Sequence, residues 1–214
     1  MIVAIAALMA AAVAVVVAAE RAGRRAPVLA AKPLASLCFV VVAWSRLHPR
    51  GPYDAWVMLA LLLCLAGDVL LLFRRAFVAG LVAFLVGHLA FVAAFAALLP
   101  PHGWPAALAL TPLAASAAAA IWLSPSLGRM RAPVLAYIAV ITVMVWGALS
   151  VVAAGNGPWF LAAGALLFYL SDLTVAYDRF VRKAFAARTF GLPAYYLGQL
   201  LFALTVGLAG VSGG

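Results

Sequence analysis

Two aspartates inside long apolar segments are the residues of this sequence best suited to chemistry. Asp68 lies within the apolar run 54–73 and Asp172 within the run 158–177. A charged side chain inside a membrane is costly, so each of these carboxyl groups needs a partner or a function. Close carboxylates repel each other, and one is expected to keep its proton while the other ionises. Such a pair can provide an acid and a base, as two carboxyl groups do in glycoside hydrolysis.

Other polar side chains in apolar segments are expected to support the aspartates or to bind substrate. They are Lys32, His88, Tyr137, Tyr195, Tyr196 and Gln199. Structural interpretations remain open for several of them. Lys32 can extend to lipid headgroups, and Tyr195 and Tyr196 can be ordinary interface aromatics. His88 can be a hydrogen-bonding residue between helices rather than a metal ligand.

The elements that must position these residues are membrane-spanning helices. The 214 residues are 69% hydrophobic and 9% charged, with a mean hydropathy of +1.21, which indicates that the solvent is lipid. About 20 apolar residues span a bilayer. Eight such runs are bounded by charge, proline or glycine, at 1–19, 28–47, 54–73, 76–99, 104–123, 132–153, 158–177 and 190–211. Their short connections predict an all-α bundle of antiparallel neighbours, in which residues 1–214 form a single integral membrane domain.

The distribution of basic residues predicts the orientation of this bundle. Fourteen Lys and Arg against five Asp and Glu give a formal charge of +9, but the charges lie between apolar runs, so we expect topology signals rather than a nucleic-acid surface. Loops after the first, third, fifth and seventh runs carry nearly all of them, whereas the opposite side carries Arg46 and Arg50. Both termini are therefore expected to face away from the cytoplasm. The protein itself is expected in the inner membrane of a bacterium.

The polar residues gather at one end of the predicted bundle. Asp68 and Asp172 each lie about 8 Å before the cytoplasmic end of their helices. The lysine and the three tyrosines lie within about two turns of the same boundary, and His88 and Gln199 lie deeper, where they are expected to form a floor. The opposite half is nearly all Ala, Val and Leu, so the sequence predicts a site near the cytoplasmic face.

Five short motifs together resemble a known family. They are Lys32-Pro33, Gly67-Asp68, the run from Phe77 to Gly87-His88, Ser171-Asp172 and Tyr195-Tyr196-x-x-Gln199. In this order they resemble the YhhN-like lysoplasmalogenase family of eight-helix membrane proteins. The resemblance implies hydrolysis of the vinyl-ether bond of lysoplasmalogens, which yields a fatty aldehyde and glycerophosphoethanolamine or glycerophosphocholine. It also implies that Asp68 and Asp172 are catalytic, whereas residues 1–31 and 100–130 carry none of the motifs.

A vinyl ether hydrolyses by protonation of an alkene carbon, which leaves an oxocarbenium ion that water captures. We expect either Asp68 or Asp172 to donate the proton and the other to stabilise the cation and orient water. Lys32 is expected to hold the headgroup phosphate. The sequence leaves open which aspartate is the acid, and whether a bacterial member acts on another ether lipid or lysolipid.

Three other functions remain open at this point. Intramembrane Asp and His often mark transport pathways, so a small-molecule or lipid transporter is the main alternative. A metal-dependent hydrolase would use His88 with the aspartates, but His48 and His102 are predicted on the far side, so a complete zinc shell is not expected. No cofactor and no metal are therefore expected. The last alternative is a scaffold without catalysis.

Overall fold

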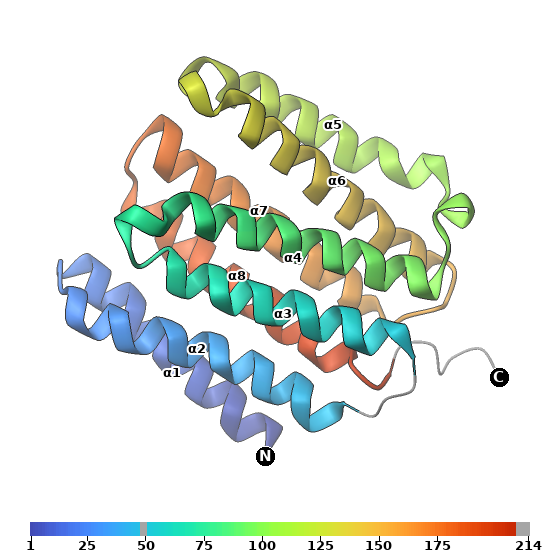
Figure 1. Ribbon diagram of the computed structural model, residues 1–214, viewed down its shortest axis with the longest axis horizontal. Coiled ribbons are helices and arrows are strands. Elements are labelled where there is room, and N and C mark those ends of the chain that lie inside the picture. Colours follow the sequence, from blue (N-terminus) through green and yellow to red (C-terminus); the bar gives the residue numbers. More distant parts are fainter. Residues whose placement is uncertain (48–50, 209–214) are drawn as a thin grey trace.

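A computed structural model describes residues 1–47 and 51–208, and the regular structure of this part of the chain is helical (Figure 1). Short 3₁₀ and π turns connect its long helices. The α-helices are α1 (Ile2–Arg21), α2 (Arg25–Arg46), α3 (Pro52–Leu70), α4 (Phe77–Leu98), α5 (Ala106–Leu123), α6 (Arg131–Ala153), α7 (Trp159–Ala176) and α8 (Phe185–Thr205). Among the described residues, α1 to α7 are long and apolar enough to cross a membrane.

α8 is not among these seven helices, and its polar residues face other helices. Tyr195, Tyr196 and Gln199 are all buried in the bundle. With 21 residues the helix is about 31 Å long, which is the thickness of a bilayer core. α8 therefore completes a bundle of membrane dimensions although its composition differs from that of the other seven.

The boundaries of α8 differ from the predicted 190–211. The helix begins at Phe185, so Arg188, expected in a loop, lies within its first turns, where it pairs with Asp178. It ends at Thr205, and residues 209–211 of the predicted span, like Arg50 and His48, lie outside the described residues. The other seven helices begin and end within a few residues of the predicted runs.

Most sequential helices pack as neighbours, as predicted, but α4 and α5 make few contacts, so the bundle is not a simple series. The most extensive contacts join α3 with α4, α7 with α8, and α1 with α2, while α8 also packs against α1, α2 and α3. α4 packs against α6, and α5 contacts mainly α6. In Figure 1, α1 and α2 lie on one side and α5 and α6 on the other, with the remaining helices between them. Residues from α2, α3 and α8 can therefore meet in the interior.

Glycines allow α7 and α8 to approach closely. A Cβ atom at Gly198 would lie 3.0 Å from the Gly164 carbonyl oxygen, and one at Gly164 would lie 3.1 Å from the Gly198 carbonyl oxygen. Small residues permit such backbone contact where helices pack in lipid. The contact fixes the height of α8 relative to α7, and so the height of Tyr195 relative to Asp172.

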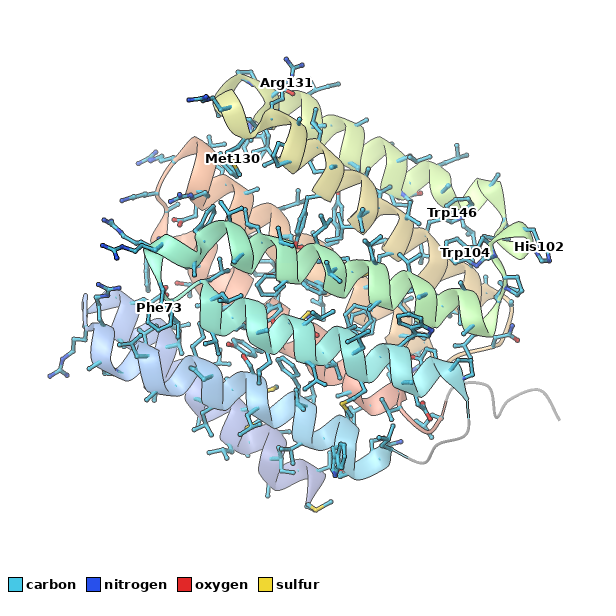
Figure 2. The ribbon with its side chains drawn as sticks, viewed as in Figure 1. Phe73, His102, Trp104, Met130, Arg131 and Trp146 are labelled. Carbon is cyan, nitrogen blue, oxygen red and sulfur yellow. The ribbon has the colours of Figure 1, made fainter. Side chains whose placement is uncertain are left out.

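The two ends of the bundle differ in chemistry. Figure 2 shows Phe73, Met130 and Arg131 at one end, and His102, Trp104 and Trp146 toward the other. Trp104 and Trp146 pack edge to face with ring centroids 5.4 Å apart. Amphipathic aromatic rings of this kind favour the level of lipid headgroups.

Candidate active site

A cavity of about 820 Å³ opens among α4, α6, α7 and α8, and both predicted aspartates line it. Lys32, Tyr137 and Tyr195 also line it. Its apolar wall is built largely by α4 and α6, through residues that include Val78, Leu81, Val82, Leu85, Val134 and Ile138. The cavity thus combines a polar end with a surface suited to a hydrocarbon chain.

Asp68 lies in a dense set of donors at the polar end. The ammonium group of Lys32 lies 3.1 Å from Asp68 Oδ1. The hydroxyls of Ser36 and Tyr195 both donate to Asp68 Oδ2, each at 2.7 Å. The Asp68 side chain is 2% exposed and that of Lys32 is 14% exposed, so the ammonium faces the carboxylate and not the open membrane surface. A positive charge and two hydroxyl donors stabilise the ionised form of this carboxyl group.

Ser36 and Tyr196 extend the network around Asp68. Ser36 stands one helical turn after Lys32, which puts both side chains on one face of α2. The Tyr196 hydroxyl donates to the Lys32 carbonyl oxygen at 3.2 Å and lies 3.3 Å from the Ser36 hydroxyl. Tyr196 therefore fixes α8 to the turn that carries the lysine. Ser36 was not among the predicted site residues, although its i+4 spacing from Lys32 was a usable signal.

Asp172 has a different set of partners. The Tyr137 hydroxyl donates to Asp172 Oδ2 at 2.9 Å, and His88 Nε2 lies 3.3 Å from the same oxygen. The Asp172 side chain is 20% exposed, against 2% for Asp68. Among the described residues no Lys or Arg pairs with this carboxyl group. Asp172 is thus the more accessible of the two carboxyl groups.

The position of His88 determines where its ring carries a proton. Its Nδ1 lies 2.7 Å from the Phe84 carbonyl oxygen, one turn earlier in α4. A carbonyl only accepts hydrogen bonds, so Nδ1 carries the hydrogen. Nε2 then faces Asp172 either as a bare lone pair, which requires a protonated carboxyl group, or as the N–H of an imidazolium beside a carboxylate. Both arrangements place one proton between Nε2 and Oδ2, across a separation of 3.3 Å.

Aromatic rings hold the imidazole in this orientation. The His88 ring centroid lies 4.3 Å from that of Phe168 and 5.1 Å from that of Tyr137. The Phe168 ring packs edge to face with that of Tyr195, which donates to Asp68. A continuous layer of rings therefore links the surroundings of the two carboxyl groups. Within residues 1–47 and 51–208, no hydrogen bond joins the carboxyl groups to each other.

Gln199 lies deeper and is separate from both carboxyl groups. Its Nε2 is 3.7 Å from the Sγ atom of Cys64, and its side chain is fully buried. The expected floor is therefore a Gln199–Cys64 contact behind the cavity wall. His88 and Tyr196 likewise do not line the cavity in the described part of the chain.

The described residues form no group of three or more His, Cys, Asp or Glu side chains that could hold a metal ion. His102 lies at the end of the bundle away from Arg131 (Figure 2). Within residues 1–47 and 51–208, the one carboxyl group paired with His88 is that of Asp172. The donors present in this part of the chain are suited to proton transfer and hydrogen bonding.

Comparison with known proteins identifies the family of this chain. The model of the YhhN family matches residues 27–206, a range that contains the eight predicted site residues. This chain belongs to the YhhN family. In this member of the YhhN family, α1 (Ile2–Arg21) lies outside the matched range.

Several relatives of this YhhN-family protein carry a functional name. It is 36% identical over 170 residues to lysoplasmalogenase TMEM86B of Mus musculus, which covers 79% of this chain and 70% of the relative. It is 34% identical over 174 residues to lysoplasmalogenase TMEM86B of Homo sapiens, covering 81% and 73%. It is also 36% identical over 156 residues to a lysoplasmalogenase of Mycobacterium tuberculosis, covering 69% and 58%. No solved structure matches this chain.

Proposed function

We propose that this multi-pass membrane protein is a lysoplasmalogenase, an enzyme that hydrolyses the vinyl-ether bond of lysoplasmalogens. The observation that carries the proposal is that two carboxyl groups in different electrostatic surroundings line one cavity with an apolar wall. The names of the mammalian and mycobacterial relatives support the same reaction. The products are a fatty aldehyde and a glycerophospho-alcohol.

Asp172 is the proton donor in this proposal. Its pair with His88 holds one proton, and its side chain is the more exposed of the two toward the cavity. The proton passes from Asp172 to the alkene carbon that does not carry the ether oxygen, and the C=C electron pair forms the new C–H bond. His88 acts as a positioning residue, because it touches Asp172 and not the cavity. General acid catalysis by a positioned side chain contributes about 10²- to 10⁴-fold to rate.

Asp68 acts as the anion of the site in this proposal. A carboxylate offers about four hydrogen-bond positions. Lys32 uses one position on Oδ1, while Ser36 and Tyr195 use two on Oδ2. The remaining position on Oδ1 accepts a hydrogen bond from the attacking water. The carboxylate charge also stabilises the oxocarbenium ion as it forms.

Water capture completes the reaction. The water oxygen bonds to the oxocarbenium carbon, and the proton that it releases restores the pair of His88 and Asp172. In the resulting hemiacetal, the hydroxyl loses its proton as its C–O bond becomes the aldehyde C=O, and the bond to the glycerol oxygen breaks. The glycerol oxygen takes up a proton in place of the one that the hydroxyl lost, and it leaves as the alcohol. One water is consumed for each aldehyde released.

Product analysis tests the reaction class. Purified protein is incubated separately with lysoplasmalogen and with an ordinary acyl lysophospholipid, and the products are identified by mass spectrometry. We expect a fatty aldehyde from the first substrate and no fatty acid from the second. Release of fatty acid from the acyl lipid, or no aldehyde from lysoplasmalogen, would contradict the proposal.

The transporter alternative receives no support from the relatives, which are named as lysoplasmalogenases. A liposome assay separates the two functions directly. A transporter moves its lipid across the bilayer intact, whereas the proposed enzyme converts it to aldehyde.

We infer that both termini face away from the cytoplasm and that the site lies near the cytoplasmic face. The support is the concentration of basic residues at the end of the bundle where Figure 2 shows Phe73 and Arg131. Arg74 and Arg75 directly follow Phe73 in the chain. Cysteine labelling tests this orientation, because the native Cys38 and Cys64 are buried.

In intact cells, a membrane-impermeant maleimide is expected to label His102→Cys but not Arg75→Cys. Both positions are exposed, so access is decided by the side of the membrane. Opening the cells is expected to make the second position reactive. Labelling of Arg75→Cys alone in intact cells would reverse the orientation.

A further inference from the structure

Charged residues also line the cavity away from the two aspartates and Lys32. They are Glu20, Arg74, Asp178, Arg179 and Arg188. They come from the end of α1, from the turns before α4 and after α7, and from the start of α8. All of these segments belong to the end of the bundle at which the basic residues gather, so they form the mouth of the cavity.

One of the three arginines at the mouth is already neutralised. Arg188 donates to Asp178 Oδ2 through Nε at 3.0 Å and through Nη2 at 2.7 Å. Its Nη1 lies 3.5 Å from Glu20 Oε2. Two carboxylates thus share one guanidinium, and this arginine is held by the protein itself.

The other two arginines have no acidic partner among the described residues. The guanidinium carbon of Arg179 lies 4.2 Å from the centroid of the Phe77 ring, and Phe77 also lines the cavity. Arg74 stands one turn before Phe77 in the same connection. The Phe77 ring therefore holds the Arg179 guanidinium close to the segment that contains Arg74.

Lys32 is not available for the role that the sequence suggested. Its ammonium group lies 3.1 Å from Asp68, and its side chain is 14% exposed. A phosphate bound there would compete with the buried carboxylate for the same charge. The cations that remain for an anionic headgroup are the arginines at the mouth.

We propose that Arg74 and Arg179 bind the phosphodiester of the substrate headgroup. This inference rests on the proposed function. Guanidinium groups match phosphate oxygens with paired hydrogen bonds. Arg179 follows Asp172 by about two helical turns, or roughly 10 Å along the axis. Six covalent bonds separate the vinyl-ether carbon of the substrate from its phosphorus, a distance of about 7 to 8 Å when extended. With the Arg179 side chain turned toward the cavity, one substrate molecule can therefore reach both Asp172 and the Arg179 guanidinium.

The test compares two substrates in phospholipid-free detergent micelles. One is lysoplasmenylethanolamine, and the other is an alkenylglycerol with the same chain and no phosphate. For Arg74→Gln and for Arg179→Gln, kcat/KM on the phosphorylated substrate is expected to fall about 10- to 100-fold through KM. On the alkenylglycerol the same variants are expected to match the wild type.

Each variant has a matched control. Arg75→Gln and Arg182→Gln remove equally exposed neighbouring charges that do not line the cavity. Both controls are expected to retain wild-type kinetics on both substrates. Equal losses on the two substrates, or equal losses in the controls, would overturn the headgroup site. A defect seen only in phospholipid vesicles would also overturn it, because the arginines would then serve the bilayer and not the substrate.

Direct binding separates this inference from the proposed reaction. Calorimetric titration with glycerophosphoethanolamine is expected to show binding to the wild type and to Arg75→Gln, and weaker binding to Arg74→Gln and Arg179→Gln. If the protein binds glycerophosphoethanolamine selectively but cleaves no vinyl ether, the headgroup site is supported and the proposed reaction is refuted. If the protein cleaves the vinyl ether of both substrates equally well and does not bind glycerophosphoethanolamine, the headgroup site is refuted and the proposed reaction stands.

Discussion

Replacing Asp172 with asparagine is expected to slow aldehyde release by about 10²- to 10⁴-fold, with little change in KM. The amide keeps the shape of the side chain and can still accept the Tyr137 hydroxyl, but it cannot pass a proton to the alkene carbon. Steady-state turnover on lysoplasmalogen in detergent measures this loss. Because the protonation step is lost rather than substrate binding, kcat carries the effect.

Asp54→Asn is the matched control for this variant. Asp54 is also buried in the bundle, but it accepts a hydrogen bond from the Gly207 amide at 3.0 Å and does not line the cavity. An asparagine there can still accept that bond, so activity near wild type is expected. Wild-type turnover by Asp172→Asn would remove this residue from the chemistry and with it the assignment of the acid.

Replacing Asp68 with asparagine is expected to reduce both stability and turnover. The change leaves the Lys32 ammonium group buried without its counter-charge, and breaking a buried pair in this way costs about 3–5 kcal/mol. Turnover is expected to fall as well, because the anion that stabilises the oxocarbenium ion is gone. Thermal unfolding in detergent and aldehyde release measure the two effects.

A double variant separates the structural role of Asp68 from its chemical role. Asp68→Leu combined with Lys32→Met replaces both charges with apolar side chains of similar volume, which is often neutral for stability. We expect the double variant to unfold nearer to the wild-type temperature than Asp68→Asn, yet to remain inactive. Recovery of turnover in the double variant would show that the carboxylate has only a structural function.

Much of the fold follows from the sequence because lipid imposes a simple rule. Apolar runs of about 20 residues must be helical to satisfy their backbone groups, so the positions of α1 to α7 could be predicted closely. The start of α8 could not, because a basic residue such as Arg188 normally indicates a loop. In the structure α8 begins at Phe185, and Arg188 lies inside it, paired with Asp178.

The sequence predicts which residues belong to the site better than it predicts which of them contact one another. Asp68 and Asp172 stand out because charge is rare inside lipid. That Asp68 pairs with Lys32 and Tyr195 depends on α3 lying beside α2 and α8, an arrangement that hydropathy does not encode. The pairing of His88 with Asp172 depends in the same way on contacts between elements distant in sequence.

The separate partners of the two carboxyl groups make the resting site electrically neutral. Lys32 and Asp68 carry opposite charges, and in the proposed mechanism His88 and Asp172 share a single proton, so each pair then has zero net charge. When the substrate takes that proton, the cation on the lipid and the anion left behind appear together and disappear together. The proposed catalytic cycle therefore separates charge only between the protein and its bound substrate, and an enzyme embedded in lipid needs no dissolved counter-ion to complete it.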